Sequence, residues 1–197
     1  RPLRGGAWQY AYTLGGPARE TLAHTLAALL DGERPAINGF VPLDGTVATV
    51  NTVSETFAQI HYDGAAADSF GGAFIAYDDP DTGAVESIDF NAAFPGGMVF
   101  QLDSTITSNV LIELTDSTGK KDTARLTDIL NFGQRWLVQG SAFFGLDLTE
   151  ITTISFVFQG AAPQELNLVW GPFDATRELG PDATKTEADI TKLPLLA

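Results

Sequence analysis

The sequence predicts an all-β protein built as a sandwich of two antiparallel sheets. Between residues 57 and 170, apolar and polar residues alternate with a period of two in short runs, which is the pattern of half-buried strands. Gly, Asp, Asn and Pro separate these runs, and they are the residues that turns require. One such separator, Asp116 to Lys120 (DSTGK), has the composition of a hairpin connection. Many short strands at this spacing favour a β-sandwich.

Each alternating run is expected to form one strand. In chain order the runs are Phe57 to Tyr62, Gly72 to Tyr77, Met98 to Asp103, Asn109 to Thr115, Thr123 to Leu126, Arg135 to Gln139, Thr153 to Gln159 and Glu165 to Trp170. Every second residue of such a strand faces the core, and the residues between them lie on the outer face of a sheet.

The first third of the chain is less regular. Ala7 to Thr13 fits a strand, whereas Ala18 to Leu30 repeats Leu and Ala at helical spacing and stops at Asp31-Gly32. We therefore expect one short N-terminal helix. Asn38 to Thr52 contains Pro, Gly and scattered apolar residues, which indicates a loop that enters a strand.

Length and composition indicate one domain with two flanking segments. The 197 residues suffice for one domain with its own core. Both ends of the chain are polar or punctuated by Pro and Gly. We expect a linker at 1–6, the sandwich at 7–173, and at 174–197 a C-terminal extension or linker that packs on the sandwich.

The charge excludes several classes of partner. Eleven Lys and Arg against 25 Asp and Glu give a formal net charge of −14, which opposes binding to nucleic acids and to anionic membrane surfaces. No stretch approaches the roughly 18 apolar residues that a membrane span requires. The chain has no Cys, and its two His are His24 and His61, so thiol chemistry and Cys-rich metal sites are excluded.

Four stretches from Ser54 onward share a recognisable order of core and turn residues. They are Glu55 to Tyr62, Phe70 to Ile75, Ile88 to Asn91 with Met98 to Asp103, and Trp136 to Phe144 followed by Leu146 to Phe158. The last of them contains the most specific run, LDLTEITTISFVF. Together the four stretches resemble the galactose-binding-like jelly-roll sandwiches that serve as carbohydrate-binding modules beside bacterial glycoside hydrolases.

This resemblance implies a jelly-roll fold and a non-catalytic module that binds poly- or oligosaccharide without a required cofactor. It further implies an attached catalytic domain or a larger surface protein, secreted or displayed outside the cell. Such modules stack a sugar ring on an aromatic side chain and bond its hydroxyl groups to polar side chains on a sheet face. Because a fold does not determine a ligand, the site residues have to be found in this chain.

Polar candidates follow from the alternation, since inward apolar residues leave their neighbours on an outer face. These outward candidates are Gln59, His61, Gln101, Asp103, Glu113, Arg135 and Gln139. The pattern does not say whether they share one sheet. The alternative is an ordinary solvated sheet face.

Aromatic candidates for sugar stacking are Trp8 and Tyr10, which alternate along one run, and Tyr77 at a strand end beside an acidic loop. For the run around Trp8 the alternative is a core face. Trp136 and Trp170 lie in apolar alternations, so we expect both in the core.

The loop from Asp78 to Glu86 concentrates carboxylates ahead of a Gly and partly matches a calcium-binding loop. Its candidate ligands are Asp79, Asp81 and Glu86. Pro80 stands at a ligand position of that pattern, and Asp-Pro-Asp-Thr-Gly is also ordinary turn chemistry. The resemblance separately implies one structural calcium ion near the chain ends, with Asp174, Glu178 or Asp182 as candidates.

No catalytic constellation stands out, so we expect that the chain is not an enzyme. Glycosidases need two carboxylates flanking the scissile bond, and no acidic cluster lies on a predicted strand. Motifs for a serine nucleophile, a zinc peptidase or a phosphate-binding loop are absent from the sequence. The alternative function is a structural or protein-interaction sandwich domain of a large extracellular protein. The architecture is also similar to that of galactose-binding-like assembly factors of respiratory complex I, but no signature specific to them occurs.

Overall fold

The alternating runs form strands in a computed structural model that describes residues 38–41, 45–54, 57–77, 85–107, 109–129, 131, 133–169, 184–187 and 190–192. The described elements are β1 (Asn38–Phe40), β2 (Val47–Ser54), β3 (Phe57–Asp63), β4 (Phe70–Ala76), α3 (Phe90–Ala93), β5 (Met98–Asp103), β6 (Asn109–Asp116), β7 (Lys121–Thr127), β8 (Gln134–Val138), η1 (Gly140–Ala142), β9 (Ile151–Gln159), β10 (Gln164–Val169), β11 (Thr184–Glu187) and β12 (Ile190–Lys192). The eight predicted strands correspond to β3 through β10, with ends shifted by at most two residues.

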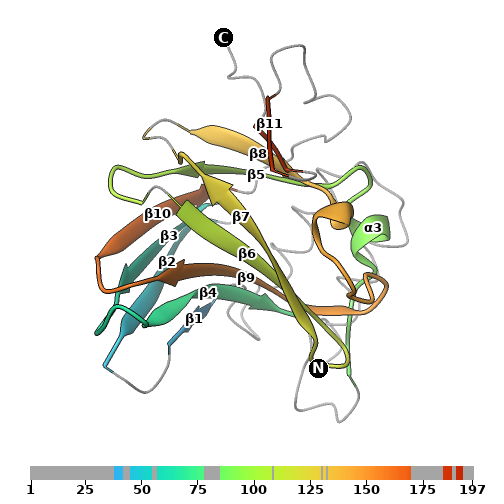
Figure 1. The fold of residues 1–197 in the computed structure, drawn as a ribbon, viewed down its shortest axis with the longest axis horizontal. Coiled ribbons are helices and arrows are strands. Elements are labelled where there is room, and N and C mark those ends of the chain that lie inside the picture. Colours follow the sequence, from blue (N-terminus) through green and yellow to red (C-terminus); the bar gives the residue numbers. More distant parts are fainter. Residues whose placement is uncertain are drawn as a thin grey trace.

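The strands form two sheets in which every described pair is antiparallel. Sheet A has the order β1-β4-β9-β6-β7, and sheet B has the order β11-β12-β8-β5-β10-β3-β2. Figure 1 shows the strands of sheet A following one another from β7 through β6 and β9 to β4 and β1. The predicted antiparallel β-sandwich is thereby confirmed.

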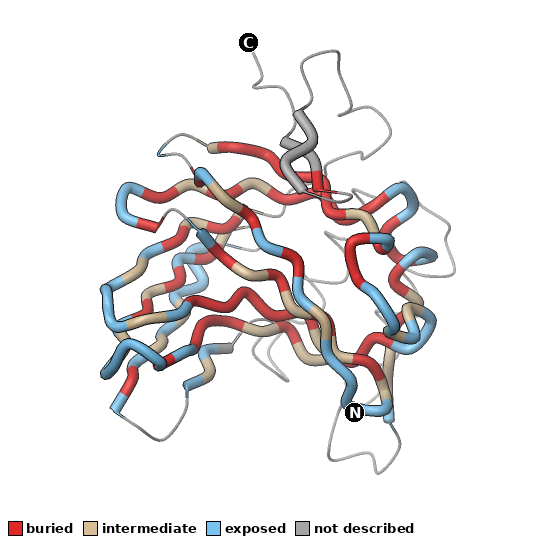
Figure 2. Tube along the Cα trace, viewed as in Figure 1, coloured by how far each residue is buried: buried red, intermediate tan, exposed pale blue. Residues whose placement is uncertain are grey.

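Aromatic side chains hold the two sheets together in the core. Phe156 of β9 packs edge to face on Phe100 of β5, with ring centroids 5.6 Å apart. Phe158 of β9 stacks on Tyr62 of β3, with ring centroids 5.7 Å apart. Trp136 is fully buried, as the sequence predicts. Each large apolar side chain buried in this way contributes roughly 1.5–3 kcal/mol. In Figure 2 the buried stretches follow the strands of both sheets.

Two parts of the described chain differ from the expected pattern. β2 is a full strand where we expected a loop entering a strand, and most of its residues are exposed, so its sequence lacks a clear apolar face. β11 and β12 fall inside the predicted C-terminal extension, and β12 pairs with β8 in sheet B. There Ile190 is buried opposite Val138, which gives the extension a place in the core. The predicted N-terminal linker, strand and helix lie outside the described residues.

One end of the sandwich is closed by α3 and by the loop around η1. Phe90 of α3 packs edge to face on Phe143, with ring centroids 6.2 Å apart. The Phe90 N–H also donates to the carbonyl of Leu148 at 2.7 Å. Asp89 caps α3 by accepting from the Ala92 N–H at 3.0 Å. The segment between η1 and β9 is therefore anchored to the core at both of its ends.

The hairpin predicted at Asp116 to Lys120 joins β6 to β7. The Gly119 N–H donates to the Asp116 carbonyl at 2.9 Å, and Gly119 has a φ of +80°. This left-handed conformation is the one that glycine adopts without steric cost. The turn chemistry of the sequence is confirmed here.

Gly72 is expected to be far less replaceable than Gly119, although both have positive φ. A Cβ on Gly72 (φ +153°) would lie 1.9 Å from the Phe156 carbonyl oxygen, whereas a Cβ on Gly119 would meet nothing within 4 Å. Gly119→Ala should therefore cost about 1–2 kcal/mol of unfolding free energy through backbone strain. Gly72→Ala should cost at least about 3 kcal/mol, because β4 must move away from β9. Urea unfolding monitored by tryptophan fluorescence measures both; equal midpoints for the two variants would contradict this packing.

Candidate functional site

The outer face of sheet A presents side chains from β4, β9, β6 and β7. Val110, Ile112 and Leu114 of β6 point into the core, so Leu111 and Glu113 lie on the opposite face. The pairing then determines the neighbours on this face. Leu111 stands opposite Arg125 on β7 and opposite Val157 on β9, and such cross-strand side chains begin about 5 Å apart.

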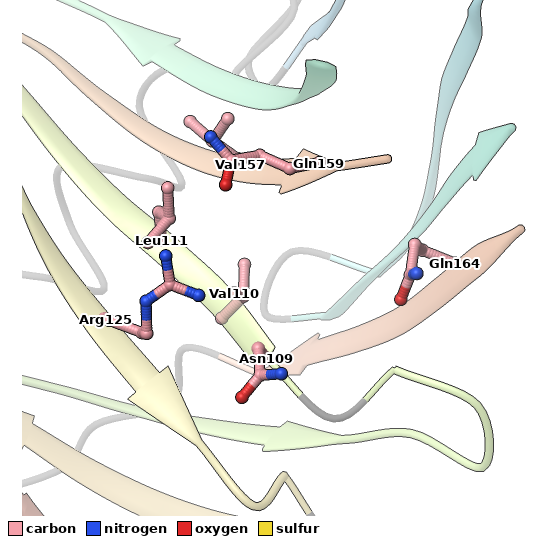
Figure 3. Close-up of a pocket in the computed structure, with 7 residues that line it drawn as sticks. All are labelled: Asn109, Val110, Leu111, Arg125, Val157, Gln159 and Gln164. Atoms are coloured by element: carbon pink, nitrogen blue, oxygen red, sulfur yellow. The ribbon is translucent and has the colours of Figure 1, made fainter. Parts of the chain in front are cut away.

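This face is hollowed by three adjoining depressions of about 240, 510 and 520 Å³. Leu111 and Gln159 line all three, so the depressions adjoin one another across the strands. The depression of about 520 Å³ also reaches Ala142 and Ile190, which are buried in the core. We call the three depressions together the sheet A groove and define it by Leu111, Glu113, Thr123, Arg125, Val157 and Gln159. Figure 3 shows one of the three depressions: Arg125 and Val157 lie on either side of Leu111, and Asn109 and Gln164 occupy one end.

The sheet A groove combines an apolar floor with polar side chains that can both donate and accept hydrogen bonds. Leu111 and Val157 form the floor. Gln159 contributes an amide, which both donates and accepts, and Arg125 contributes a planar set of donors. A ligand that carries hydroxyl groups around an apolar face would match this arrangement.

One carboxylate lies in the groove, and two aromatic rings lie along its borders. Glu113 is paired with Lys121, with its Oε1 2.8 Å from the Lys121 Nζ. Phe70, at the start of β4, stands opposite Gln159 and is 46% exposed. Phe144, in the loop after η1, borders the depression that also contains Arg125.

The outer face of sheet B collects several of the sequence-predicted candidates. A chain of hydrogen bonds crosses four strands there: Asn51 donates to Gln59 and Gln59 donates to Asn167, both at 3.3 Å, and Asn167 donates to Asp103 at 2.7 Å. The next row holds His61, whose Nδ1 lies 3.6 Å from Glu165 Oε1. These amides and carboxylates already bond to one another. A ligand on this face would have to replace those bonds.

The predicted polar candidates are therefore divided between the two sheets. Gln59, His61, Gln101 and Asp103 lie on the outer face of sheet B, whereas Glu113 lies in the sheet A groove. The structure does not bring all five together.

Three predicted candidates occupy positions that differ from those expected. Tyr77 is 1% exposed and belongs to the core, because it lies on the same inward side of the chain as Ala73 and Ile75. It therefore cannot stack on a sugar. Arg135 lies beside Gln101 on the outward side of β8 but is 5% exposed, so it is covered. Gln139 follows the end of β8 and precedes η1, so it is not on a strand. Trp8 and Tyr10 lie outside the described residues.

The described residues hold no group of three His, Asp or Glu side chains that could bind a metal ion. Glu86 is described, but its proposed partners Asp79 and Asp81 are not. Asp174, Glu178 and Asp182, the candidates near the chain end, also lie outside the described part. Calcium binding at either place stays a prediction.

Most residues of the sheet A groove were missed at the level of sequence, although the signal was present. Ala124 and Leu126 point inward, so Thr123 and Arg125 between and beside them point outward. The same alternation identified Glu113 on its own strand. Phe156 and Phe158 likewise leave Val157 and Gln159 outward. The alternation was sufficient to name these side chains. It could not show that β9 lies beside β6.

Comparisons with known proteins return structural likenesses only. No protein-family model matches the sequence, and no curated protein matches it. The family 11 carbohydrate-binding module from Clostridium thermocellum, in complex with a β-1,3-1,4-mixed-linked tetrasaccharide, is 11% identical, with a TM-score of 0.47, and the match covers 84% of this chain and 93% of that one. The family 11 module of the cellulosomal cellulase Lic26A-Cel5E from the same organism is 12% identical, with a TM-score of 0.47 and coverage of 82% and 89%.

An exo-β-agarase is also similar, at 12% identity and a TM-score of 0.47, but the match covers 72% of this chain and 24% of the agarase. The modules found are of the kind that the sequence resembles. Identities this low and TM-scores below 0.5 decide neither the ligand of this chain nor its site residues. Among the residues that the structure describes, no helix is long and apolar enough to cross a membrane.

A network of hydrogen bonds around Asp116 connects the β6–β7 turn to the loop bordering the groove. The Asp116 carboxylate accepts from the Thr118 hydroxyl at 2.6 Å and from the Thr118 and Lys120 N–H groups at 2.9 and 3.1 Å. Its other oxygen accepts from the Asp147 N–H at 3.2 Å. These bonds favour the ionised form and lower the pKa of Asp116, with the bond from the Thr118 hydroxyl contributing most.

Asp116 should make the folded state sensitive to acid. Because its pKa is lower when folded than when unfolded, its ionised form stabilises the fold above about pH 4, and that contribution is lost as pH falls through the folded pKa. We expect Asp116→Asn to be less stable than the wild type at pH 7, with a difference that narrows toward pH 3. Urea unfolding at pH 7, 5 and 3 measures the trend. Asp63→Asn, at the exposed end of β3, controls for the loss of one negative charge. A constant difference across the pH range would contradict the assignment.

Proposed function

We propose that this protein is a non-catalytic module that binds a poly- or oligosaccharide in the sheet A groove. The observation that supports this proposal is that three adjoining depressions share an apolar floor and planar polar side chains from β6, β7 and β9. A sugar ring offers C–H groups to an apolar floor and hydroxyl groups to Gln159 and Arg125. Because the groove extends across strands, it suits a stretch of a chain rather than one enclosed molecule.

The charges at the groove favour a neutral ligand. Arg125 lines the groove, but Glu113 is nearby and the whole chain carries a formal charge of −14. A strongly anionic polymer would be repelled by the protein as a whole. A neutral glycan avoids that repulsion and still forms hydrogen bonds with a guanidinium and an amide.

The carboxylates beside the groove support a binding role rather than catalysis. Glu113 is held by Lys121, and Asp122 accepts a hydrogen bond from the Phe144 N–H. Glycosidic bond cleavage needs two carboxylates placed on either side of the scissile bond. Both of these acids instead bond to protein groups that stabilise local structure.

The proposal extends to the setting of the module. On the sequence resemblance, we place it in a larger secreted enzyme or surface protein, where it would raise the local concentration of an attached catalytic domain on its polysaccharide. The binding itself requires no cofactor. Calcium at the loop containing Asp79, Asp81 and Glu86 would add stability and take no part in recognition of the sugar.

Two alternatives have support of their own. The outer face of sheet B offers Gln59, His61, Gln101 and Asp103 as a second candidate sugar-binding surface. A structural or protein-interaction role is favoured by β2, a strand at the end of the sheet B order whose outward Val47 is 48% exposed. Exposed apolar side chains on such an outermost strand suit contact with another chain.

Matched glutamine variants should distinguish the two sheet faces. Gln159→Ala should weaken binding about tenfold, since one lost hydrogen bond at a buried contact removes about 1.4 kcal/mol. Arg125→Ala should weaken it at least as much. Gln59→Ala, the same substitution on sheet B, should leave affinity unchanged. Affinity electrophoresis on soluble β-glucans, xylan, mannan and algal polysaccharides selects the polymer, and calorimetry then measures each variant.

Other results of these measurements would indicate a different binding site or a different function. Loss of binding in Gln59→Ala alone would move the site to sheet B. A folded wild-type protein that is retained by none of the polymers would reject the carbohydrate proposal. It would leave the interaction domain as the better explanation, and sedimentation would then test whether the protein self-associates.

A further inference from the structure

Phe144 is the most exposed large apolar side chain among the described residues, at 72%. It lies in the loop between η1 and β9 and borders the same depression as Leu111, Thr123 and Arg125. A single exposed apolar residue is common on protein surfaces and needs no special explanation. What distinguishes Phe144 is the way in which its backbone is held.

Polar side chains from the hairpin bond to the backbone of this loop at three places. The Phe144 N–H donates to Asp122 Oδ2 at 2.5 Å. The next carbonyl, that of Gly145, accepts from Lys120 Nζ. Two residues further on, the Asp147 N–H donates to the Asp116 carboxylate at 3.2 Å. The loop is therefore attached to β7 and to the β6–β7 turn.

This attachment has a consequence for recognition. A loop that must be ordered upon binding loses conformational entropy and weakens the complex, whereas a loop fixed in advance avoids that loss. The bonds act on the backbone on both sides of the ring. The aromatic side chain is thus held at the border of the groove and exposed to solvent there.

We propose, on the basis of the function proposed above, that Phe144 forms an aromatic subsite at one end of the sheet A groove. Its ring packs on the C–H face of one pyranose unit of the bound chain. The hydroxyl groups of that unit face Thr123 and Arg125. The subsite selects sugars that present an unbroken apolar face. An oligosaccharide bound at the Asn109 and Gln164 end of the groove reaches it only when it is long enough to extend to the loop.

Affinity measured against oligosaccharide length tests this subsite. The ligands are a length series prepared from the polymer that retains the wild type, measured by calorimetry. For long oligosaccharides, we expect Phe144→Ala to bind about threefold to tenfold more weakly than the wild type. For oligosaccharides too short to reach the loop, the two proteins should bind equally.

Substitutions at the same position separate ring stacking from simple apolar contact. Phe144→Tyr should retain affinity, because the ring is kept, whereas Phe144→Leu should behave like Phe144→Ala. Asp122→Ala, which frees the Phe144 backbone, should also weaken long oligosaccharides selectively. Val53→Ala, which trims an exposed apolar side chain on β2, should change nothing. Circular dichroism and thermal melting verify that each variant is folded.

The outcomes separate this inference from the function on which it rests. If Gln159→Ala loses binding while Phe144→Ala binds long oligosaccharides like the wild type, the subsite is wrong and the groove stands. Full affinity in Phe144→Leu, or an equal loss at every ligand length, also overturns the subsite. If the folded wild type binds no polymer, the proposed function fails, and the subsite fails with it.

Discussion

The structure depends on the position of β9 between β4 and β6. Through its inward residues, Phe156 and Phe158, this strand joins sheet A to Phe100 and Tyr62 of sheet B. Its outward residues form part of the groove floor. One strand therefore contributes both to the contact between the sheets and to the surface that we propose binds sugar. A shift of its register by one residue would reverse both roles at once, because side chains alternate along a strand.

Because opposite faces of the strands serve stability and binding, the residues of the groove can be substituted without loss of the fold. Burial of inward side chains such as Ile112 and Phe156 supplies the stability of sheet A, and the outward Arg125 and Gln159 contribute little to it. The outward positions can vary in size, charge and hydrogen bonding while the fold persists. That freedom explains how one sandwich architecture can accommodate different ligands. It also explains why the fold by itself does not name the ligand.

The strands could be predicted because every second residue of each run is apolar and faces the core, as Ala58, Ile60 and Tyr62 show. The same alternation placed Trp136 in the core. Tyr77, named as a stacking candidate, is instead buried, because it follows Ala73 and Ile75 on the inward side of the strand. β2 could not be recognised in the same way, because most of its residues face solvent.

The groove could be predicted only in part, because it depends on pairing between distant segments. Leu111 and Val157 are opposite each other in sheet A, and no feature of either strand alone specifies that partner. The β6–β7 contact is different, since the turn chemistry at Asp116 to Lys120 indicates it directly. Glu113 was named from the alternation within β6. The alternation within β9 marks Gln159 as outward in the same way, but only the structure shows that both residues line one depression.

The β6–β7 turn is where the stability of the fold and the geometry of the proposed site meet. Its side chains satisfy backbone groups of the turn itself and also hold the loop that carries Phe144. That loop is anchored in the core at both ends, and polar bonds to the neighbouring hairpin fix the part between them, where the Phe144 ring faces solvent. A substitution in the turn would thus alter the position of the Phe144 loop without changing any residue that lines the groove. The surroundings of a sandwich face, and not only its outward side chains, determine what that face can bind.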